Sequence, residues 1–181
     1  MNLPNKLTTL RVILVPVLIV VLLTGHYYTA AVIFAAASFT DMLDGKIARK
    51  YGLVTNFGKL MDPLADKLLV MSALICLVQL SSIPGWMVIV ILGREFAITG
   101  LRTVAASEGL VIAAGRSGKI KTVLQMVAIT LILLKNRPFA YIDIPMDQIL
   151  LWAAVAMTVY SGAEYIIIQR SEERRVGKEC R

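Results

Sequence analysis

Long runs without a formal charge dominate the chain and are separated by short polar clusters. The first run covers residues 12–40. As one helix it would be about 44 Å long, which exceeds a hydrocarbon layer of roughly 30 Å. Gly25 and His26 form the natural break, and Tyr27 and Tyr28 follow at the level of an aromatic belt. The pattern therefore predicts a first helix over about Leu7–Thr24 and a second that begins near Tyr28.

A second uncharged run, residues 68–93, is interrupted in the same way by Ser81-Ser82-Ile83-Pro84-Gly85. Two more apolar stretches cover residues 118–134 and 147–168. Stretches of this kind are helical in a bilayer, because lipid offers no hydrogen-bond partner to the backbone. We therefore expect six helices.

Composition places these helices in a membrane. Of the 181 residues, 57% are hydrophobic and 17% are charged, against about 45–50% and 25% in soluble domains. The mean hydropathy is +0.74. Cys76 lies deep in an apolar run, so it and Cys180 predict no disulfide framework. The predicted fold is all-α, an integral membrane bundle of six transmembrane helices with a short amino-terminal interfacial segment.

The basic residues predict the orientation of the bundle. The net charge is +7, but the basic residues form short clusters beside apolar runs, which is typical of membrane proteins and not of nucleic-acid binding. With the amino terminus inside, the outer turns carry Lys135 and Arg137 alone of 19 basic residues. We therefore expect a multi-pass protein of the plasma membrane with both termini in the cytoplasm.

The chain divides into one long domain and a short tail. Residues 1–170 form the predicted membrane domain, and the first apolar run lacks the small-residue site of a cleavable signal peptide. After Arg170 the composition changes abruptly. We interpret residues 171–181 as a polar tail, compatible with a cloning remnant, and exclude it from the functional argument.

Four acidic residues lie where a membrane disfavours them. Asp41 comes about 13 residues after the start of the second helix, or roughly 20 Å along it. A carboxylate at that depth costs several kcal/mol unless it is compensated, so it marks a candidate functional site. Asp44, Asp62 and Asp66 follow within the next 25 residues.

The spacing of these acids predicts a metal site. Asp41 and Asp44 are three residues apart, and Asp62 and Asp66 are four apart, so each pair shares a helix face. The short link 50–57 predicts antiparallel neighbours whose acidic faces can meet. Converging carboxylates require protonation or a cation. Oxygen ligands favour two Mg²⁺ or Mn²⁺ ions.

Small residues beside the acids predict a phosphate-containing ligand. Gly45, Ala48 and Gly58 leave space for a bulky group to approach the backbone. Arg49 adds a bidentate donor suited to phosphate. Metal ions, room beside the backbone and a guanidinium group together favour a site for a diphosphate. The alternative is a surface network in which the acids pair with neighbouring basic residues, namely Lys46, Arg49, Lys59 and Lys67.

These residues resemble the signature of the CDP-alcohol phosphotransferase family. All eight positions are present, in the string Asp41-x2-Asp44-Gly45-x2-Ala48-Arg49-x8-Gly58-x3-Asp62-x3-Asp66. Three further stretches are similar to the bacterial phosphatidylglycerophosphate synthase branch: residues 2–11 with Asn5 and Thr8, residues 93–102, and residues 118–122. The resemblance extends from residue 2 to about residue 168.

The resemblance implies an enzyme that transfers the phosphatidyl group of CDP-diacylglycerol to an alcohol and releases CMP. It implies a homodimer among membrane lipids, with a two-metal site that opens toward the cytoplasm. On this basis the metal ligands are Asp41, Asp44, Asp62 and Asp66, and Asp66 is also the expected base. The expected nucleotide and diphosphate pocket consists of Asn5, Thr8, Gly45, Ala48, Arg49 and Gly58.

A second basic set is the candidate site for the phosphate of the acceptor, and it contains Arg94, Arg102, Arg116, Lys119 and Lys121. Arg94 follows an apolar run by one glycine, so we expect it to be partly buried. Glu95 is expected to be its ion partner. The alternative role for each of these cations is anchoring at the membrane surface. The family branch implies sn-glycerol 3-phosphate as the acceptor.

Other functions remain open at this stage. The same chemistry could use inositol phosphate or serine as acceptor. An intramembrane prenyltransferase also binds a lipid diphosphate through aspartates, although such enzymes are usually larger. A divalent-cation transporter could use the aspartates for permeation, but it would not need Gly45, Ala48 and Arg49 beside them. In the last helix Ala153, Ala154 and Ala156 are candidates for dimer contacts.

Overall fold

The computed structural model describes the backbone of residues 3–51, 56–107, 115–137, 139 and 144–179. Side chains are described for residues 9–40, 64–65, 67–105, 115, 117–137, 139 and 144–167. This part of the chain forms six α-helices and no strand, which confirms the all-α prediction. The helices are α1 Leu3–Leu23, α2 Tyr27–Tyr51, α3 Asn56–Gln79, α4 Gly85–Ser107, α5 Arg116–Leu133 and α6 Met146–Glu179.

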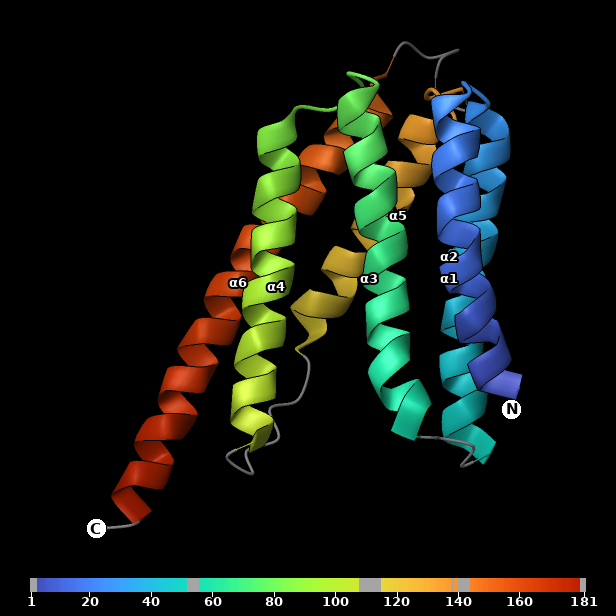
Figure 1. Cartoon of the computed structure of the whole chain (residues 1–181). Coiled ribbons are helices and arrows are strands. Elements are labelled where there is room, and N and C mark those ends of the chain that lie inside the picture. Colours follow the sequence, from blue (N-terminus) through green and yellow to red (C-terminus); the bar gives the residue numbers. More distant parts are fainter. Residues whose placement is uncertain (1–2, 52–55, 108–114, 138, 140–143, 180–181) are drawn as a thin grey trace.

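The helices run alternately up and down, so the bundle has two distinct ends (Figure 1). At the end that we call the turn end, α1 connects to α2, α3 to α4 and α5 to α6. At the opposite end, which we call the motif end, α2 and α4 finish and α1, α3 and α5 begin. The last helix extends through residue 179, so residues 171–179 of the predicted tail continue α6.

The three helices that finish at the turn end close with the same backbone motif. In each, a residue with positive φ follows the last turn: Gly25 at 82°, Ser81 at 54° and Lys135 at 52°, the last followed by Asn136 at 53°. Paired backbone bonds complete a Schellman motif at each site, namely Gly25–Leu22 with His26–Val21, Ser81–Val78 with Ser82–Leu77, and Lys135–Ile132 with Asn136–Leu131. The predicted breaks after residues 24, 80 and 134 are therefore confirmed.

The hydrophobic core lies in the half of the bundle near the turn end. Fully buried side chains include Leu18 and Leu22 of α1, Phe34 of α2 and Leu74 of α3. The helices α4, α5 and α6 add Met87, Ile91, Ile129, Leu133 and Leu151. Toward the motif end this apolar packing gives way to polar side chains.

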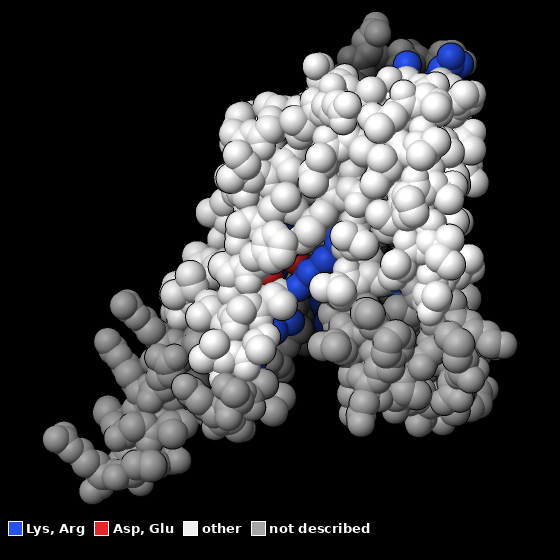
Figure 2. All heavy atoms as spheres, viewed as in Figure 1, with Lys and Arg blue, Asp and Glu red and all other residues white. Residues whose placement is uncertain are grey.

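The outer surface of the bundle is also apolar, which fits a lipid environment. Large hydrophobic side chains are exposed on every helix, for example Ile13, Val32, Ile75 and Ile89. Figure 2 shows a mostly uncharged face with charged side chains in a central hollow and at the turn end. An exposed apolar surface of this extent marks a membrane or partner contact.

Within the described part of the chain, one helical stretch is both long and apolar enough to cross a membrane, Met146–Ile167. Three shorter apolar stretches are Thr9–Leu23, Tyr27–Thr40 and Lys67–Gln79. The number of predicted helices is thus confirmed, and a crossing by all six stays a prediction. The expected interfacial segment is continuous with α1, which begins at Leu3.

Candidate active site

The helices bring the two acidic pairs to one end of the bundle. Asp41 and Asp44 lie in the second half of α2, and Asp62 and Asp66 lie in the first half of α3. Both segments belong to the motif end (Figure 1). The four side chains lie outside the described set. Among described residues α1 packs against both helices, whereas α2 and α3 contact each other little, so α1 is the principal neighbour of each.

The other signature residues occupy the same end. Gly45, Ala48 and Arg49 lie in the last turns of α2, and Gly58 lies in the first turn of α3. Asn5 and Thr8 lie in the first turns of α1. Their side chains also lie outside the described set, so their predicted roles at a diphosphate rest on backbone position alone.

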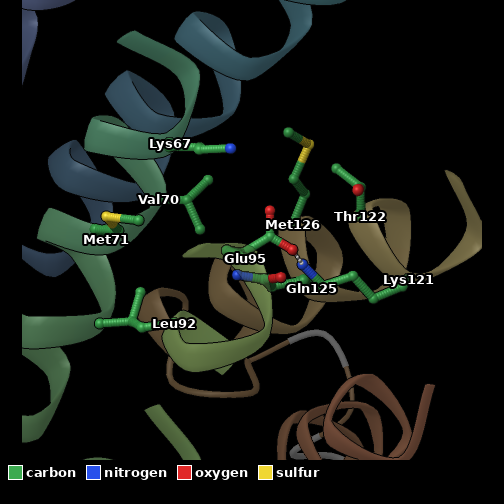
Figure 3. A pocket seen from close by; sticks show the side chains of 9 residues that line it. All are labelled: Lys67, Val70, Met71, Leu92, Glu95, Lys121, Thr122, Gln125 and Met126. Carbon is green, nitrogen blue, oxygen red and sulfur yellow. Dashed lines mark hydrogen bonds and ion pairs between the residues drawn. The ribbon is translucent and has the colours of Figure 1, made fainter. Parts of the chain in front are cut away.

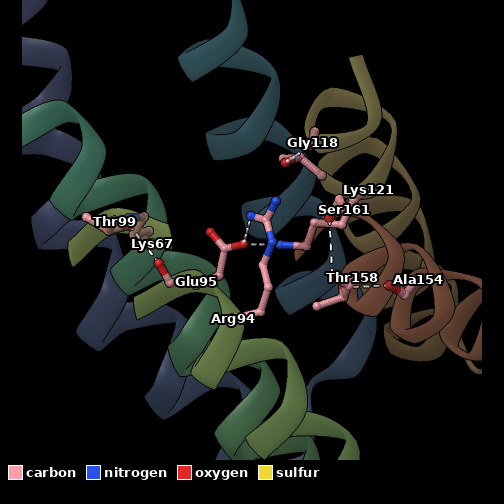
Figure 4. Close-up of polar contacts among 10 residues, drawn as sticks. Lys67, Arg94, Glu95, Thr99, Gly118, Lys121, Ala154, Thr158 and Ser161 are labelled. Carbon is pink, nitrogen blue, oxygen red and sulfur yellow. Dashed lines mark hydrogen bonds and ion pairs between the residues drawn. The ribbon is translucent and has the colours of Figure 1, made fainter. Parts of the chain in front are cut away.

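A described ionic cluster lies beside these segments and centres on Glu95 of α4 (Figure 4). Its Oε1 accepts a hydrogen bond from Arg94 Nη1 at 3.0 Å and another from Lys121 Nζ at 2.5 Å. The Arg94 and Lys121 side chains are 15% and 3% exposed. The expectation that Glu95 is an ion partner and that Arg94 is partly buried is confirmed. One carboxylate thus serves two cations, from α4 and α5.

The cluster forms one wall of a pocket between α3, α4 and α5 (Figure 3). About 400 Å³ of space, part of it open to solvent, lies between residues of mixed polarity. The polar lining residues are Lys67, Glu95, Lys121, Thr122 and Gln125, and the apolar ones are Val70, Met71, Leu92 and Met126. Lys67 Nζ also donates to Thr99 Oγ1 on α4. Because Lys67 directly follows Asp66, the pocket begins where the acidic segment of α3 ends.

The described side chains around the pocket carry more positive than negative charge. The described side chains of Lys67, Arg94 and Lys121 supply three cations, and Glu95 supplies one anion. A low local dielectric strengthens the attraction of such a site for phosphate. The Gln125 side chain, buried to 4% exposure on α5, adds a neutral donor and acceptor. The arrangement can therefore hold and orient a phosphorylated small molecule.

The five cations predicted for the acceptor phosphate divide into groups. Arg94 and Lys121 come together on Glu95. Arg102 shares the α6-facing side of α4 with Arg94, and its guanidinium lies 5.3 Å from the centre of the Tyr165 ring. Lys119 is exposed, and the side chain of Arg116 lies outside the described set. The structure thus unites two of the five residues in one cluster.

Sequence reasoning did not assign Lys67, Thr99, Thr122 and Gln125 to the site. A signal was present for Gln125, which lies four residues after Lys121 in a predicted apolar helix and so shares its face. The sequence suggests Lys67 only as a surface ion-pair partner of the neighbouring acids. No local pattern indicated Thr99, because its contact with Lys67 joins residues 32 positions apart.

Comparisons with known proteins agree with the signature. A family model described as CDP-alcohol phosphatidyltransferase matches residues 1–160. A Bacillus subtilis protein named CDP-diacylglycerol–glycerol-3-phosphate 3-phosphatidyltransferase is 49% identical over 179 residues, covering 91% of this chain and 93% of the relative. A Rickettsia felis protein of the same name is 40% identical over 169 residues, with coverages of 91% and 93%. A Mycobacterium tuberculosis protein named probable phosphatidylglycerophosphate synthase is 42% identical over 171 residues, with coverages of 91% and 80%.

Proposed function

The chain belongs to the CDP-alcohol phosphatidyltransferase family, and from this premise we propose that it transfers the phosphatidyl group of CDP-diacylglycerol to sn-glycerol 3-phosphate. The products are phosphatidylglycerophosphate and CMP. The observation that carries this proposal is the 49% identity, across nearly the whole chain, to a relative whose name states that activity. The complete signature and the cationic pocket support it. The reaction belongs to phosphatidylglycerol synthesis.

The proposal assigns two divalent cations, Mg²⁺ or Mn²⁺, to the motif end. Asp41, Asp44, Asp62 and Asp66 would hold them, since hard cations prefer carboxylate oxygens. His26, the single histidine of the chain, lies in the turn at the opposite end, where its Nδ1 is 3.2 Å from Thr24 Oγ1, so an imidazole-rich zinc site does not fit. When bound, such cations neutralise a diphosphate and stabilise the leaving oxygen.

The remaining steps fall to residues of this chain. Asp66 accepts the proton of the acceptor hydroxyl as that oxygen forms its bond to the phosphatidyl phosphorus and the bond to the CMP oxygen breaks. Gly45, Ala48 and Gly58 leave room for the cytidine diphosphate. Arg49, Asn5 and Thr8 donate to it.

The acceptor phosphate is assigned to the cationic pocket. Arg94 and Lys121 hold it from α4 and α5, and Arg102, Arg116 and Lys119 complete the basic surroundings of its entry. Lys67, between Asp66 and the pocket, attracts the phosphate toward the base. A phosphate ester bound in the pocket beside Lys67 would lie close in the chain's fold to Asp66, the proposed base, and catalysis by proximity requires such closeness.

We further propose that the motif end faces the cytoplasm. The basic residues concentrate there, and the exposed apolar side chains of all six helices would contact lipid or a second copy of the chain in a homodimer. The acyl chains of the donor would then leave sideways between helices. Of the three alanines predicted for dimer contacts, Ala154 is fully buried inside the bundle, Ala153 is half-buried and Ala156 is exposed, so Ala156 is the most available to a partner.

One assay tests the activity. Purified protein is supplied with CDP-diacylglycerol and Mg²⁺ or Mn²⁺, and CMP is measured with glycerol 3-phosphate, inositol phosphate or serine offered separately. We expect CMP release with glycerol 3-phosphate, and its loss when a chelator removes the cation. Release with another acceptor alone would reassign the substrate. Pyrophosphate release from a prenyl diphosphate would indicate a prenyltransferase, and nucleotide-independent metal uptake into proteoliposomes would indicate a transporter.

A further inference from the structure

The side chain of Arg94 lies against two glycines from other helices, Gly162 and Gly118, and we call the space between them the glycine slot. Figure 4 shows Arg94 together with Gly118. Gly162 of α6 lies against its aliphatic part, and a Cβ atom built at that position would be 3.3 Å from Arg94 Cγ. Gly118 of α5 lies near the guanidinium, where a Cβ would be 3.8 Å from Nη2. The first distance is shorter than an ordinary carbon–carbon contact. A methyl group at residue 162 would therefore require the Arg94 side chain to give way by a few tenths of an ångström.

The two ends of the Arg94 side chain are also fixed. Its Cα belongs to α4, and its Nη1 donates to Glu95 Oε1, which simultaneously accepts from Lys121. An intruding methyl group at position 162 could not be avoided by a simple rotation, since rotation would break this bond. The guanidinium would have to shift by a few tenths of an ångström, and Lys121 would shift with it.

The guanidinium retains unused donor capacity. Arg94 Nε is buried and has no hydrogen-bond partner within the described part of the chain. A buried N–H group without a partner is costly unless a ligand satisfies it. Nη1 is engaged by Glu95, so Nε is the donor that would remain for a ligand oxygen, and a shift of the side chain at Gly162 would move it.

We propose that Gly162 is a positioning residue, which sets the location of the Arg94 guanidinium and thereby the affinity for the phosphate of the acceptor. The inference rests on the proposed function. It extends that proposal to α6, because Gly162 lies two residues beyond the region that the family model matches. Gly162 touches neither substrate, and it acts through Arg94.

The test compares three glycine-to-alanine variants that differ in the space around the added methyl group. Gly162→Ala has the tight contact, Gly118→Ala has an ordinary one, and Gly100→Ala on α4 has nothing within 4 Å. All three substitutions change helix propensity in the same direction, since alanine is favoured over glycine in a helix by about 1 kcal/mol. Differences in activity among the three variants therefore reflect the space around the added methyl group.

The readout is the KM for each substrate in the CMP-release assay. For Gly162→Ala we expect the KM for glycerol 3-phosphate to rise about three- to ten-fold, because a shift of 1 Å in a binding group can cost about 100-fold. The KM for CDP-diacylglycerol should stay unchanged. For Gly118→Ala the KM for glycerol 3-phosphate should rise by less than about two-fold on the same scale. For Gly100→Ala that KM should equal the wild-type value. An acceptor KM for Gly162→Ala equal to that of Gly100→Ala overturns the inference.

A double-mutant cycle keeps the test decisive if Gly162→Ala folds poorly. Arg94→Ala removes Cγ, so the methyl group at position 162 then has room. The double variant should melt in detergent at a temperature equal to or above that of Arg94→Ala alone. A melting temperature of the double variant below that of Arg94→Ala would contradict the proposed tight contact between residue 162 and the Arg94 side chain. Failure of the proposed function is distinguishable, because wild-type protein would then release no CMP with glycerol 3-phosphate.

Discussion

The two ends of the bundle use positive charge in opposite ways. At the turn end, Lys135 Nζ lies 4.1 Å from the centre of the Tyr27 ring, and the Arg137 guanidinium lies 5.6 Å from that of Tyr28. Both cations are exposed. At the motif end, Arg94 and Lys121 are drawn into the bundle and share Glu95.

The difference follows from the surroundings of each charge. Exposed cations stay hydrated and gain a modest interaction from an aromatic face, so the turn end needs no acidic partner. A buried cation loses its hydration and requires a carboxylate or a ligand. The turn end therefore uses charge to fasten a loop against α2, whereas the motif end keeps charge available for chemistry. Changes at the motif end should accordingly have much larger effects.

The largest effect is expected at the proposed metal site. Asp62→Ala should reduce Mg²⁺- or Mn²⁺-dependent CMP release by about 10³-fold or more, since metal stabilisation of developing charge is worth several kcal/mol. The protein should still fold, as shown by an unchanged elution profile in detergent. Wild-type activity in this variant would count decisively against metal ligation by Asp62.

The next largest effect concerns the base. Asp66→Asn should slow transfer by about 10²- to 10⁴-fold, the usual contribution of a general base. Binding of CDP-diacylglycerol should persist in part, because the amide keeps the size of the side chain. Binding is measured with labelled donor in the absence of acceptor. Transfer at the normal rate would require another base.

Glu95→Gln tests the shared carboxylate. Two largely buried cations would lose their negative partner, so we expect a loss of about 2 kcal/mol or more in unfolding free energy. That loss corresponds to a fall in Tm of roughly 4–8 °C for a chain of this size. The matched control is Asp147→Asn in the first turn of α6, at the other end of the bundle. Equal falls in the two variants would contradict a special role for the cluster.

The smallest effect is expected at the turn end. Lys135→Ala removes the cation over Tyr27 and should cost about 0.5–1 kcal/mol in stability. The KM values for both substrates should not change, because the residue lies at the end opposite to the signature. A rise in either KM would show that the two ends are coupled, and the contrast between them would fail.

Much of the fold was predictable because local physics fixes it. Uncharged runs marked the helices, and Gly25 and the stretch 81–85 marked the breaks between them. Lys135 is an exception. Its backbone has the left-handed conformation that glycine usually adopts at the end of a helix, and a lysine in the sequence does not predict that conformation. The acidic pairs were assigned to two helices from spacing alone, and both helices are present.

The sequence by itself determined the helices, the end at which the signature lies and the family to which the chain belongs, because these depend on residue type and short spacing. The tertiary structure decided which side chains meet. Glu95 joins Lys121 across 26 residues, Lys67 reaches Thr99 across 32, and Gly162 borders Arg94 across 68. Helical periodicity gives the face on which a residue lies but not the helix that this face will meet. The packing of α4 against α3 and α6, together with the Lys121 side chain that reaches Glu95 from α5, supplied that information.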